Sequence, residues 1–248
     1  MSEAEKLIIA GLGEVGQPLL HILSRSFDCV GVDIDPVVVM GPVSVLHVCY
    51  PFQIPRYVQV TAEYIRRFSP ALTIIHTTVP PGTTRQVQDE VPESMVAFSP
   101  VRGKHARMEQ DMLRYSKFAA APKQEAVAAA LDHLAAAGFK TATFPSPEIA
   151  ELAKLLETTY LGVLIAWTQE MERLAAQYRG SFADVNSFVE EVEFLPSDVF
   201  PGVIGGHCVL PNIDLLRSRV DSAFLNLVVD SNQLKLQAPD SVGAGAAQ

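Results

Sequence analysis

The sequence predicts an α/β domain followed by a small all-helical domain, and three features support this. From Lys6 to Phe144, short apolar runs alternate with amphipathic segments, as strands and helices do around a parallel sheet. A glycine-rich turn, Gly11 to Gly16, joins the first apolar run to the first amphipathic segment. The longest periodic segment, Glu148 to Tyr178, repeats apolar residues at the steps that one long, partly buried helix requires. We therefore expect a Rossmann-like domain over residues 1–145, a helical domain over 146–235 and a disordered tail, rich in Ala, Gly and Ser, over 236–248.

The glycine turn predicts a dinucleotide site. Gly11 permits the tight turn, Gly13 lets the backbone approach a pyrophosphate, and Gly16 lets the helix pack closely on the strand. Free N–H groups at the start of that helix would face the anion. The second apolar run ends in Asp33, which would accept hydrogen bonds from a ribose 2′-OH and repel a 2′-phosphate, so NAD is favoured over NADP. The expected cofactor contacts here are Gly11, Gly13, Glu14, Val15, Gly16 and Asp33, and the alternative is a glycine turn without a ligand.

The chain after Asp33 predicts a trimmed sheet. Only a few residues separate Asp35-Pro36 from the next apolar run, Val43 to Cys49, where a full dinucleotide fold has a longer helical crossover. Tyr50 and Pro51 close this run at the edge where a cofactor would lie if the sheet is parallel.

Polar side chains also follow two later predicted strands. Thr77 and Thr78 follow the run Ala71 to His76, where hydroxyls can contact a ligand or cap the next helix. The cations Arg102 and Lys104, with His105 beside them, follow the run Met95 to Phe98. They indicate a contact to an anion or a sugar, or alternatively a solvated loop.

Composition excludes several classes of function. The net charge of −9 argues against nucleic acid or an anionic membrane as the main partner. The cysteines Cys29, Cys49 and Cys208 show neither a disulfide framework nor zinc spacing, so we expect a reducing cytoplasm and no metal. The first residues are polar, and no apolar run is long enough to span a bilayer.

Cys208 is the first candidate for the chemistry. It follows Gly205 and Gly206, stands beside His207, and precedes a segment whose helix start would stabilise a thiolate. Such a thiolate could attack an aldehyde, and hydride transfer from the adduct to NAD would give a thioester. Local sequence alone favours the alternative, a small buried hydrophobic residue.

Lys154 is the second candidate. It lies off the apolar stripe of the long helix, on a face shared with Thr158, where an ammonium could stabilise a developing oxyanion. Local sequence alone favours a solvated lysine that pairs with Glu151 and Glu157.

Four motifs, in this order over residues 6 to about 216, resemble those of the UDP-glucose/GDP-mannose dehydrogenase family. They are GLGEVG with VGVDID, HTTVPPGTT, AELAKLLETTYLGVLIAWTQEM and PGVIGGHCVLPN, and GGHC is most similar to the UDP-N-acetylmannosamine dehydrogenase branch. The resemblance implies a four-electron oxidation with two NAD, in which Cys208 is the nucleophile and Lys154 stabilises the oxyanion or activates water. Thr78 matches a residue near the nicotinamide or the water. The resemblance also implies a homodimer formed through the long helix.

The chain departs from the family at three positions. Val101 stands where the family has an acid, although Arg102 is kept; Thr158 replaces an asparagine; and Asn212 replaces an acid, unless Asp214 substitutes for it. Each lost group would help to position water or hydrolyse the thioester. The chain stops soon after the cysteine motif, so we expect it to lack the C-terminal nucleotide-sugar-binding domain, which a separate chain could supply.

Three functions remain open at this point. The first is an NAD-dependent oxidation of a primary alcohol, on a sugar or sugar nucleotide, through Cys208 and Lys154. The second resembles the β-hydroxyacid dehydrogenases, a two-electron reaction with Lys154 as general acid and Cys208 dispensable. The third is a non-catalytic NAD-binding partner or sensor. In the enzyme readings the partner is a small-molecule substrate, and its expected contacts are Arg102, Lys104, Thr158, His207 and Asn212.

Overall fold

Residues 5–34, 38–196, 198–206 and 208–238 are described by the structure, a computed structural model. The chain packs as two compact units, Met1–Lys154 and Leu155–Gln248. Helix α6 (Pro147–Gln177) begins in the first unit and continues into the second. Of the predicted tail, residues 239–248 lie outside the described residues, whereas Leu236 and Gln237 belong to the last helix.

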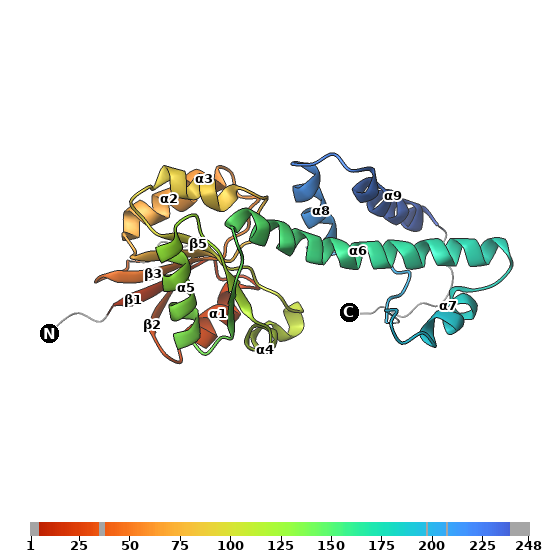
Figure 1. Cartoon of the computed structure of the whole chain (residues 1–248), viewed down its shortest axis with the longest axis horizontal. Coiled ribbons are helices and arrows are strands. Elements are labelled where there is room, and N and C mark those ends of the chain that lie inside the picture. The colour runs from red at the N-terminus through yellow and green to blue at the C-terminus, as the bar shows by residue number, and fades with distance from the viewer. Residues whose placement is uncertain (1–4, 35–37, 197, 207, 239–248) are drawn as a thin grey trace. The chain divides into compact units, whose positions relative to one another are not determined.

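The first unit is built on a five-stranded sheet in which every neighbouring pair is parallel. In spatial order the strands are β2 (Asp28–Val32), β1 (Lys6–Ala10), β3 (Val43–Val48), β4 (Leu72–Ile75) and β5 (Val96–Phe98). The carboxyl ends of all five strands therefore meet at one edge, as the α/β prediction required. Figure 1 shows the sheet with helices on both of its faces.

Both faces of the sheet are buried, because successive side chains of a strand point to opposite sides. Ile9 of β1 packs with α1 (Gly16–Leu23), α4 (Met108–Arg114) and α5 (Gln124–Ala136). Its neighbour Ile8 packs on the other face with α2 (Tyr57–Phe68) and α3 (Thr83–Glu90). Both isoleucines are fully buried, so neither face of the sheet is left to solvent.

The prediction of a trimmed sheet is confirmed. Between β2 and β3 the described residues, 33–34 and 38–42, form no helix, and β3 pairs with β1 on the side away from β2. The strand that a full dinucleotide fold adds beyond β2 has no counterpart among the described residues. β2 is consequently an edge strand.

Two further strands of the first unit lie outside the main sheet. β6 (Lys117–Ala119) and β7 (Thr141–Thr143) form a small parallel pair of their own. A single antiparallel bridge, Phe98 to Ala120, links this pair to the end of β5. The runs Phe118 to Ala121 and Thr141 to Phe144 predict both strands, but the alternating pattern does not reveal that these strands lie outside the main sheet.

The second unit contains the later part of α6 with α7 (Phe182–Glu190), α8 (Val209–Arg217) and α9 (Ala223–Gln237). The apolar spacing of residues 214–227 predicts a single helix, and this prediction is wrong. The chain turns between Arg217 and Ala223, and Val220 within the turn is 49% exposed. A Cβ on Gly162 would lie 2.6 Å from Val209 Cγ1, so α8 packs closely on α6.

Among the described residues, no helix is both long enough and apolar enough to cross a membrane.

Candidate functional site

The glycine turn joins β1 to α1 at the carboxyl edge of the sheet. Gly11 has φ 92°, and a Cβ there would lie 2.4 Å from the backbone nitrogen of Tyr50. A Cβ on Gly16 would lie 1.8 Å from the carbonyl oxygen of Gly11. The fold itself therefore requires both glycines. Gly13 differs, because nothing lies within 4 Å of the position that its Cβ would take. The open space beside Gly13, at the start of α1, fits a pyrophosphate.

Asp33 directly follows β2 and its side chain is exposed. Its Oδ2 accepts the backbone N–H of Leu12 at 3.0 Å, and its Oδ1 accepts the N–H of Ile34 at 3.0 Å. The carboxylate is thus fixed beside the glycine turn while each oxygen keeps a free acceptor position. These residues fit the ribose and pyrophosphate of a dinucleotide. Asp35 lies outside the described residues.

Glu14 connects the glycine turn to the loop after β5. Its Oε2 lies 3.1 Å from Nδ1 of His105, which begins the 3₁₀ helix η1 (His105–Arg107). Both side chains are partly exposed, so the pair adds little stability. It does hold two segments of the carboxyl edge next to each other. Val15 is half-buried and is the N-terminal cap residue of α1.

The loops after β3 and β4 are tied together by buried hydroxyls. Thr77 Oγ1 donates to the carbonyl oxygen of Tyr50 at 2.7 Å, and the Tyr50 hydroxyl lies 2.8 Å from Thr61 Oγ1. Burial raises the pKa of Tyr50 above its ordinary value. Thr77 therefore positions the Tyr50 loop, while Thr78 is half-buried and Pro51 is exposed.

Glu151 is the buried carboxylate of the first unit that sequence reasoning misjudged. It has no exposed surface, and it accepts the N–H groups of Gly82 at 2.6 Å and Thr84 at 2.8 Å. Burial raises the pKa of this carboxyl, although the two N–H donors oppose the shift. Glu151 thus caps α3, and it is not the solvated partner that the alternative for Lys154 assumed. It fixes the first turns of α6 to the TTVPPGTT loop, and Lys154 lies on the next turn, half-buried.

The loop after β5 holds a cation that the sequence linked to substrate. Arg102 Nη2 donates to the carbonyl oxygen of Ser116 at 2.6 Å, and its guanidinium lies 5.2 Å from the centre of the Phe118 ring. Val101, where the family has an acid, is 6% exposed and belongs to the apolar core on the α1 side of the sheet. Lys104 is exposed, and its backbone N–H is bound by the buried Asp111 at 3.0 Å.

Cys208 is the N-terminal cap residue of α8 and is half-buried, so a helix does begin directly after the thiol. The glycine-rich segment before it is held by two buried amides. Gln169 of α6 donates to the carbonyl oxygen of Gly202 at 2.7 Å, and Asn232 of α9 accepts the N–H of Ile204 at 2.7 Å. Sequence reasoning missed both; the available signal was an amide within each apolar helical pattern. His207 lies outside the described residues.

The two altered positions of the second unit contact each other. Asn212 Nδ2 donates to Thr158 Oγ1 at 2.9 Å, and the Thr158 hydroxyl donates to the carbonyl oxygen of Leu155 at 3.0 Å. Asn212 is 6% exposed, and its backbone N–H bonds to the carbonyl oxygen of Cys208 at 3.1 Å. Asp214 is exposed and pairs with Arg217 at 3.3 Å. Asn212, rather than Asp214, is thus the residue that faces Thr158.

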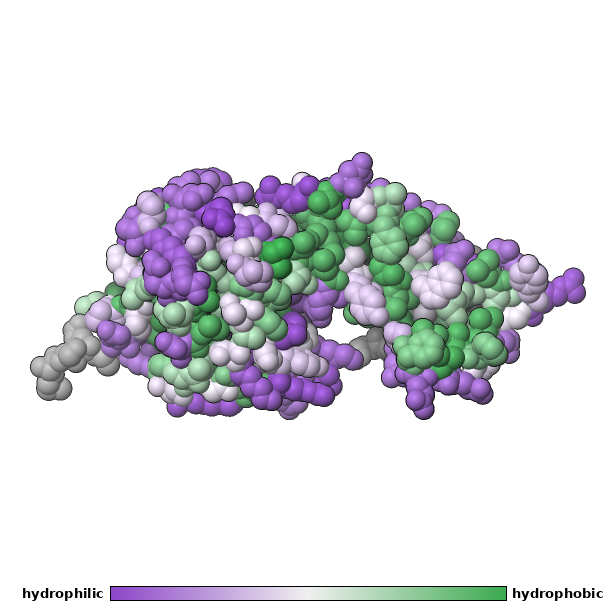
Figure 2. All heavy atoms as spheres, viewed as in Figure 1, coloured by the Kyte–Doolittle hydropathy of each residue, from purple (hydrophilic) through white to green (hydrophobic). Residues whose placement is uncertain are grey.

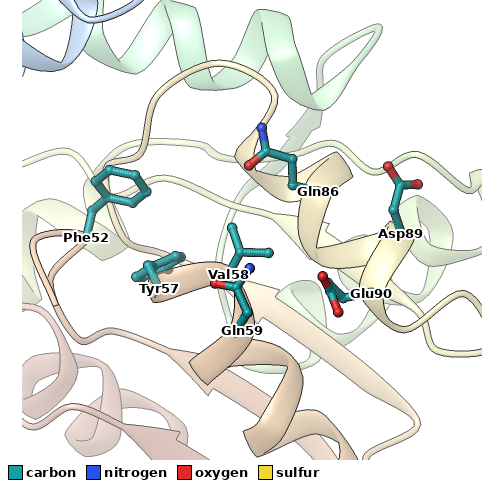
Figure 3. A pocket seen from close by; sticks show the side chains of 7 residues that line it. All are labelled: Phe52, Tyr57, Val58, Gln59, Gln86, Asp89 and Glu90. Carbon is teal, nitrogen blue, oxygen red and sulfur yellow. The ribbon is translucent and has the colours of Figure 1, made fainter. Parts of the chain in front are cut away.

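A hollow of about 430 Å³ lies between α2 and α3, and its lining includes no residue of the glycine turn. Figure 3 shows Gln86, Asp89 and Glu90 of α3 on one side, opposite residues of α2 and the loop before it. Its lining is Phe52, Tyr57, Val58, Gln59, Gln86, Asp89 and Glu90. With two carboxylates and no cation in this lining, the hollow does not suit the phosphates of a dinucleotide.

Comparison with known proteins finds a family match over part of the chain and a fold match over most of it. Residues 148–233 match the family model for the central domain of the UDP-glucose/GDP-mannose dehydrogenase family. A UDP-D-ManNAc dehydrogenase from Pyrococcus horikoshii has a similar structure, with a TM-score of 0.80 and 20% identity over 92% of this chain and 68% of that one. A UDP-glucose dehydrogenase from Pyrobaculum islandicum gives 0.74 and 19%, over 94% and 69% of the two chains.

A third structure resembles this chain along nearly all of its own length. It is a 3-hydroxyisobutyrate dehydrogenase from Mycobacterium tuberculosis, with a TM-score of 0.67 and 15% identity over 94% of each chain. No curated protein matches the sequence. The expected resemblance is therefore confirmed, by the family model over residues 148–233 and by the fold over most of the chain.

Proposed function

We propose that this chain is an NAD-dependent dehydrogenase. The premise is that residues 148–233 carry the central domain of the UDP-glucose/GDP-mannose dehydrogenase family. The chain oxidises a primary alcohol, on a sugar or sugar nucleotide, through a covalent adduct on Cys208. The observation that carries this proposal is the placement of Cys208 at the start of α8, after a glycine-rich segment held by Gln169 and Asn232. A thiol that served only as core filler would need neither the helix start nor the fixed approach.

The glycine turn supports NAD as the cofactor. Gly13 leaves room for the pyrophosphate, and the fixed carboxylate of Asp33 would accept hydroxyls of the adenosine ribose. Its negative charge would repel the extra phosphate of NADP. Glu14, Val15, Tyr50, Pro51 and Thr77 complete the proposed cofactor contacts.

The catalytic roles follow from the chemistry of each side chain. When bound, NAD accepts the hydride from the carbon that is oxidised. The Cys208 thiolate adds to the aldehyde carbon, forming a C–S bond, and the adduct becomes a thioester when its hydride leaves. The Lys154 ammonium stabilises the negative oxygen of the adduct. Water then breaks the C–S bond and releases the acid and the thiol, with Thr78 beside the nicotinamide or the water.

The pair Asn212 and Thr158 bears on the last step. An amide and a hydroxyl are both neutral over the working pH range, so neither removes a proton from water as a carboxylate can. Val101 is likewise apolar and buried. We therefore expect thioester hydrolysis to be slower than formation of the thioester. The proposed substrate contacts are Arg102, Lys104, Thr158, His207 and Asn212.

The test replaces the thiol and follows NADH. Cys208→Ser and a control variant, Cys29→Ser, are compared with the wild-type protein on a panel of nucleotide sugars and hydroxy acids. Cys29 is a second half-buried free thiol, located on β2. We expect acid production to be lost only in the Cys208 variant. Unchanged acid production would contradict the covalent mechanism, and tight NAD binding without turnover on any substrate would favour a non-catalytic sensor.

A two-electron oxidation is the second candidate, favoured by one observation. The fold also resembles that of a 3-hydroxyisobutyrate dehydrogenase, with a TM-score of 0.67. In this case Lys154 would act as general acid and Cys208 would be dispensable. One NADH per substrate, retained in Cys208→Ser and lost in Lys154→Met, would establish this candidate over the first, which yields two.

We also propose that the chain forms a homodimer through α6. Trp167 of α6 is 59% exposed, and Tyr178, which directly follows this helix, is 86% exposed. Figure 2 shows apolar residues gathered over α6 and α7. They border a hollow of about 510 Å³ lined by Trp167, Met171, Leu174, Ala175, Tyr178, Gly180, Val185 and Val189. Exposed apolar surface of this kind marks contact sites. Light scattering should give a dimer that Trp167→Glu dissociates and that Gln177→Glu, on the exposed end of α6, does not; a monomeric wild type would contradict the proposal.

A further inference from the structure

The first unit contains a continuous chain of four basic side chains that the proposed reaction does not use. His47 of β3 is central: its Nδ1 lies 2.9 Å from His76 Nε2, and its Nε2 lies 3.1 Å from His133 Nε2 of α5. Lys117 of β6 extends the chain, with Nζ 3.1 Å from His76 Nδ1. The rings of His47 and His76 are stacked, with centroids 5.2 Å apart. Every link is within hydrogen-bond distance.

This chain of four side chains is buried, and none of its members carries a compensating negative charge. His47, His76 and Lys117 are at most 3% exposed, and only His133 is half-buried. Burial, and secondarily the neighbouring basic groups, lower the pKa values of His47 and His76 well below the usual range. Burial alone lowers the pKa of His133 to about 4. The three rings are therefore neutral near pH 7.

Lys117 is the member of the chain that titrates near neutral pH. Among the described residues, the charged or ionisable groups that act on it are Cys49, Arg102 and Lys154, together with the histidines. Burial, with smaller contributions from the cations Arg102 and Lys154, lowers the pKa of Lys117 to about 7. Its amine also donates to the carbonyl oxygens of Ser99 at 2.9 Å and Pro100 at 3.1 Å, which hold it in either protonation state.

The hydrogen-bonded chain of basic side chains runs along one face of the sheet. His76 directly follows β4, and Lys117 bonds to the residues that directly follow β5, so this end lies at the carboxyl edge. The His133 ring contacts the Phe27 ring at a tilt, with centroids 5.1 Å apart, and Phe27 directly precedes β2, at the amino edge. The two ends of the chain thus lie toward opposite edges of the sheet. The rings do not converge on one point, and no three His, Cys, Asp or Glu side chains among the described residues could hold a metal.

The proton on each ring is fixed by its neighbours, because a neutral imidazole has one donor and one acceptor. When Lys117 is an ammonium, it donates to His76 Nδ1; His76 Nε2–H then donates to His47 Nδ1, and His47 Nε2–H donates to His133 Nε2. When Lys117 is an amine, all these bonds reverse: His133 Nε2–H donates to His47, His47 Nδ1–H donates to His76, and His76 Nδ1–H donates to Lys117 or Ser99. Going from the first state to the second moves each proton one link and releases one proton from His133 Nδ1.

We propose that Lys117, His76, His47 and His133 form a proton wire that stores one proton at the carboxyl edge and exchanges it with solvent at α5. Each hydride transfer from an alcohol to NAD⁺ also releases one proton. Release of the stored proton through His133 leaves Lys117 as an amine, and this amine would then accept the proton from the substrate. This role in turnover rests on the proposed function, whereas the wire itself does not.

The test reads the tautomers directly, without cofactor or substrate. In protein labelled with ¹⁵N in the histidine rings, the ring nitrogen shifts report which nitrogen carries the proton. We expect His47, His76 and His133 to reverse their tautomers together, at one midpoint near pH 7, while all three stay neutral. Lys117→Met should abolish the reversal and leave the signals of the exposed His21 in place. Independent midpoints, a reversal that persists in Lys117→Met, or imidazolium formation before the reversal would each overturn the proposal.

A second variant keeps the wire testable if Lys117→Met does not fold. In His133→Gln the amide can donate or accept but cannot pass a proton on, so the reversal of His47 and His76 should persist. Exchange of the His47 ring proton with solvent should slow by at least about tenfold, because a positioned proton carrier has been lost. His21→Gln, on the exposed side of α1, is the matched control. An unchanged exchange rate in His133→Gln would overturn the exit at His133. A working wire in a protein that binds no NAD would reject the proposed function alone.

Discussion

Replacement of Gly13 by alanine tests whether this glycine is needed for cofactor binding rather than for folding, in contrast to Gly16. Nothing lies within 4 Å of the added methyl group, and the φ of Gly13 is not positive. The folded chain should therefore accept Gly13→Ala. A loop glycine in a conformation that alanine can adopt even gains about 0.4–1 kcal/mol of stability on replacement, because the unfolded chain loses freedom.

The cofactor should not accept the same change. If the pyrophosphate of NAD lies against Gly13, the methyl group occupies space that the phosphate needs. Overfilling a packed site costs about 1–3 kcal/mol. At about 1.4 kcal/mol for each factor of ten, the Kd for NAD should rise by about 5- to 150-fold.

Titration calorimetry with NAD and thermal unfolding of the same samples measure both effects. Gly16→Ala is the matched control, because its Cβ would lie 1.8 Å from the Gly11 carbonyl oxygen and force the backbone to move. We expect a lower Tm in Gly16→Ala and an unchanged or higher Tm in Gly13→Ala. If Gly13→Ala binds NAD as the wild type does, the pyrophosphate does not lie at this turn.

Three further predictions follow from buried polar groups. Glu151→Gln should lower the free energy of unfolding by about 1–2 kcal/mol in urea, because one N–H group of the α3 start loses its acceptor. Burial raises the folded pKa of Glu151, so its contribution to stability decreases as pH rises from the unfolded value of 4.5 through the folded one; this slope should be absent in the variant. A double-mutant cycle with Thr158→Val and Asn212→Leu should give a coupling free energy of about 1 kcal/mol, and a value near zero would contradict the 2.9 Å bond. Because Lys117 is deprotonated in the folded chain above about pH 7 and in the unfolded chain only above 10.5, wild-type stability should rise between these values, and the rise should be missing in Lys117→Met.

The sequence predicted the sheet well because strand signals are local. Apolar runs, the glycine turn and the short link after Asp33 are each visible within a few residues, and the trimmed sheet follows from them. The break between α8 and α9 was missed because Leu216, Val220 and Phe224 recur at four-residue steps, as they would in one continuous helix. Apolar periodicity does not reveal a turn that keeps this spacing.

The candidate site residues could be named from the sequence, whereas the contacts among them could not. Thr158 and Asn212 were each recognised as a departure, but their hydrogen bond joins positions 54 apart and needs the packing of α8 on α6. His47 lies within one apolar run and His76 ends another, so both look like ordinary strand residues. Only the pairing of β3 with β4, and the helix α5 above them, brings their rings together with His133.

The trimmed sheet has a consequence for how the protein would report its ligand. In a full dinucleotide fold the strand that carries the ribose-binding acid has a neighbour on both sides. Here β2 pairs with β1 alone, so its outward amides have no strand partner among the described residues. Amides on an edge strand exchange their hydrogens through local fraying more readily than central ones. An adenosine ribose held by Asp33 would restrain the end of that strand. Cofactor binding should therefore lower the deuterium uptake of β2 and leave that of β3 and β4 unchanged.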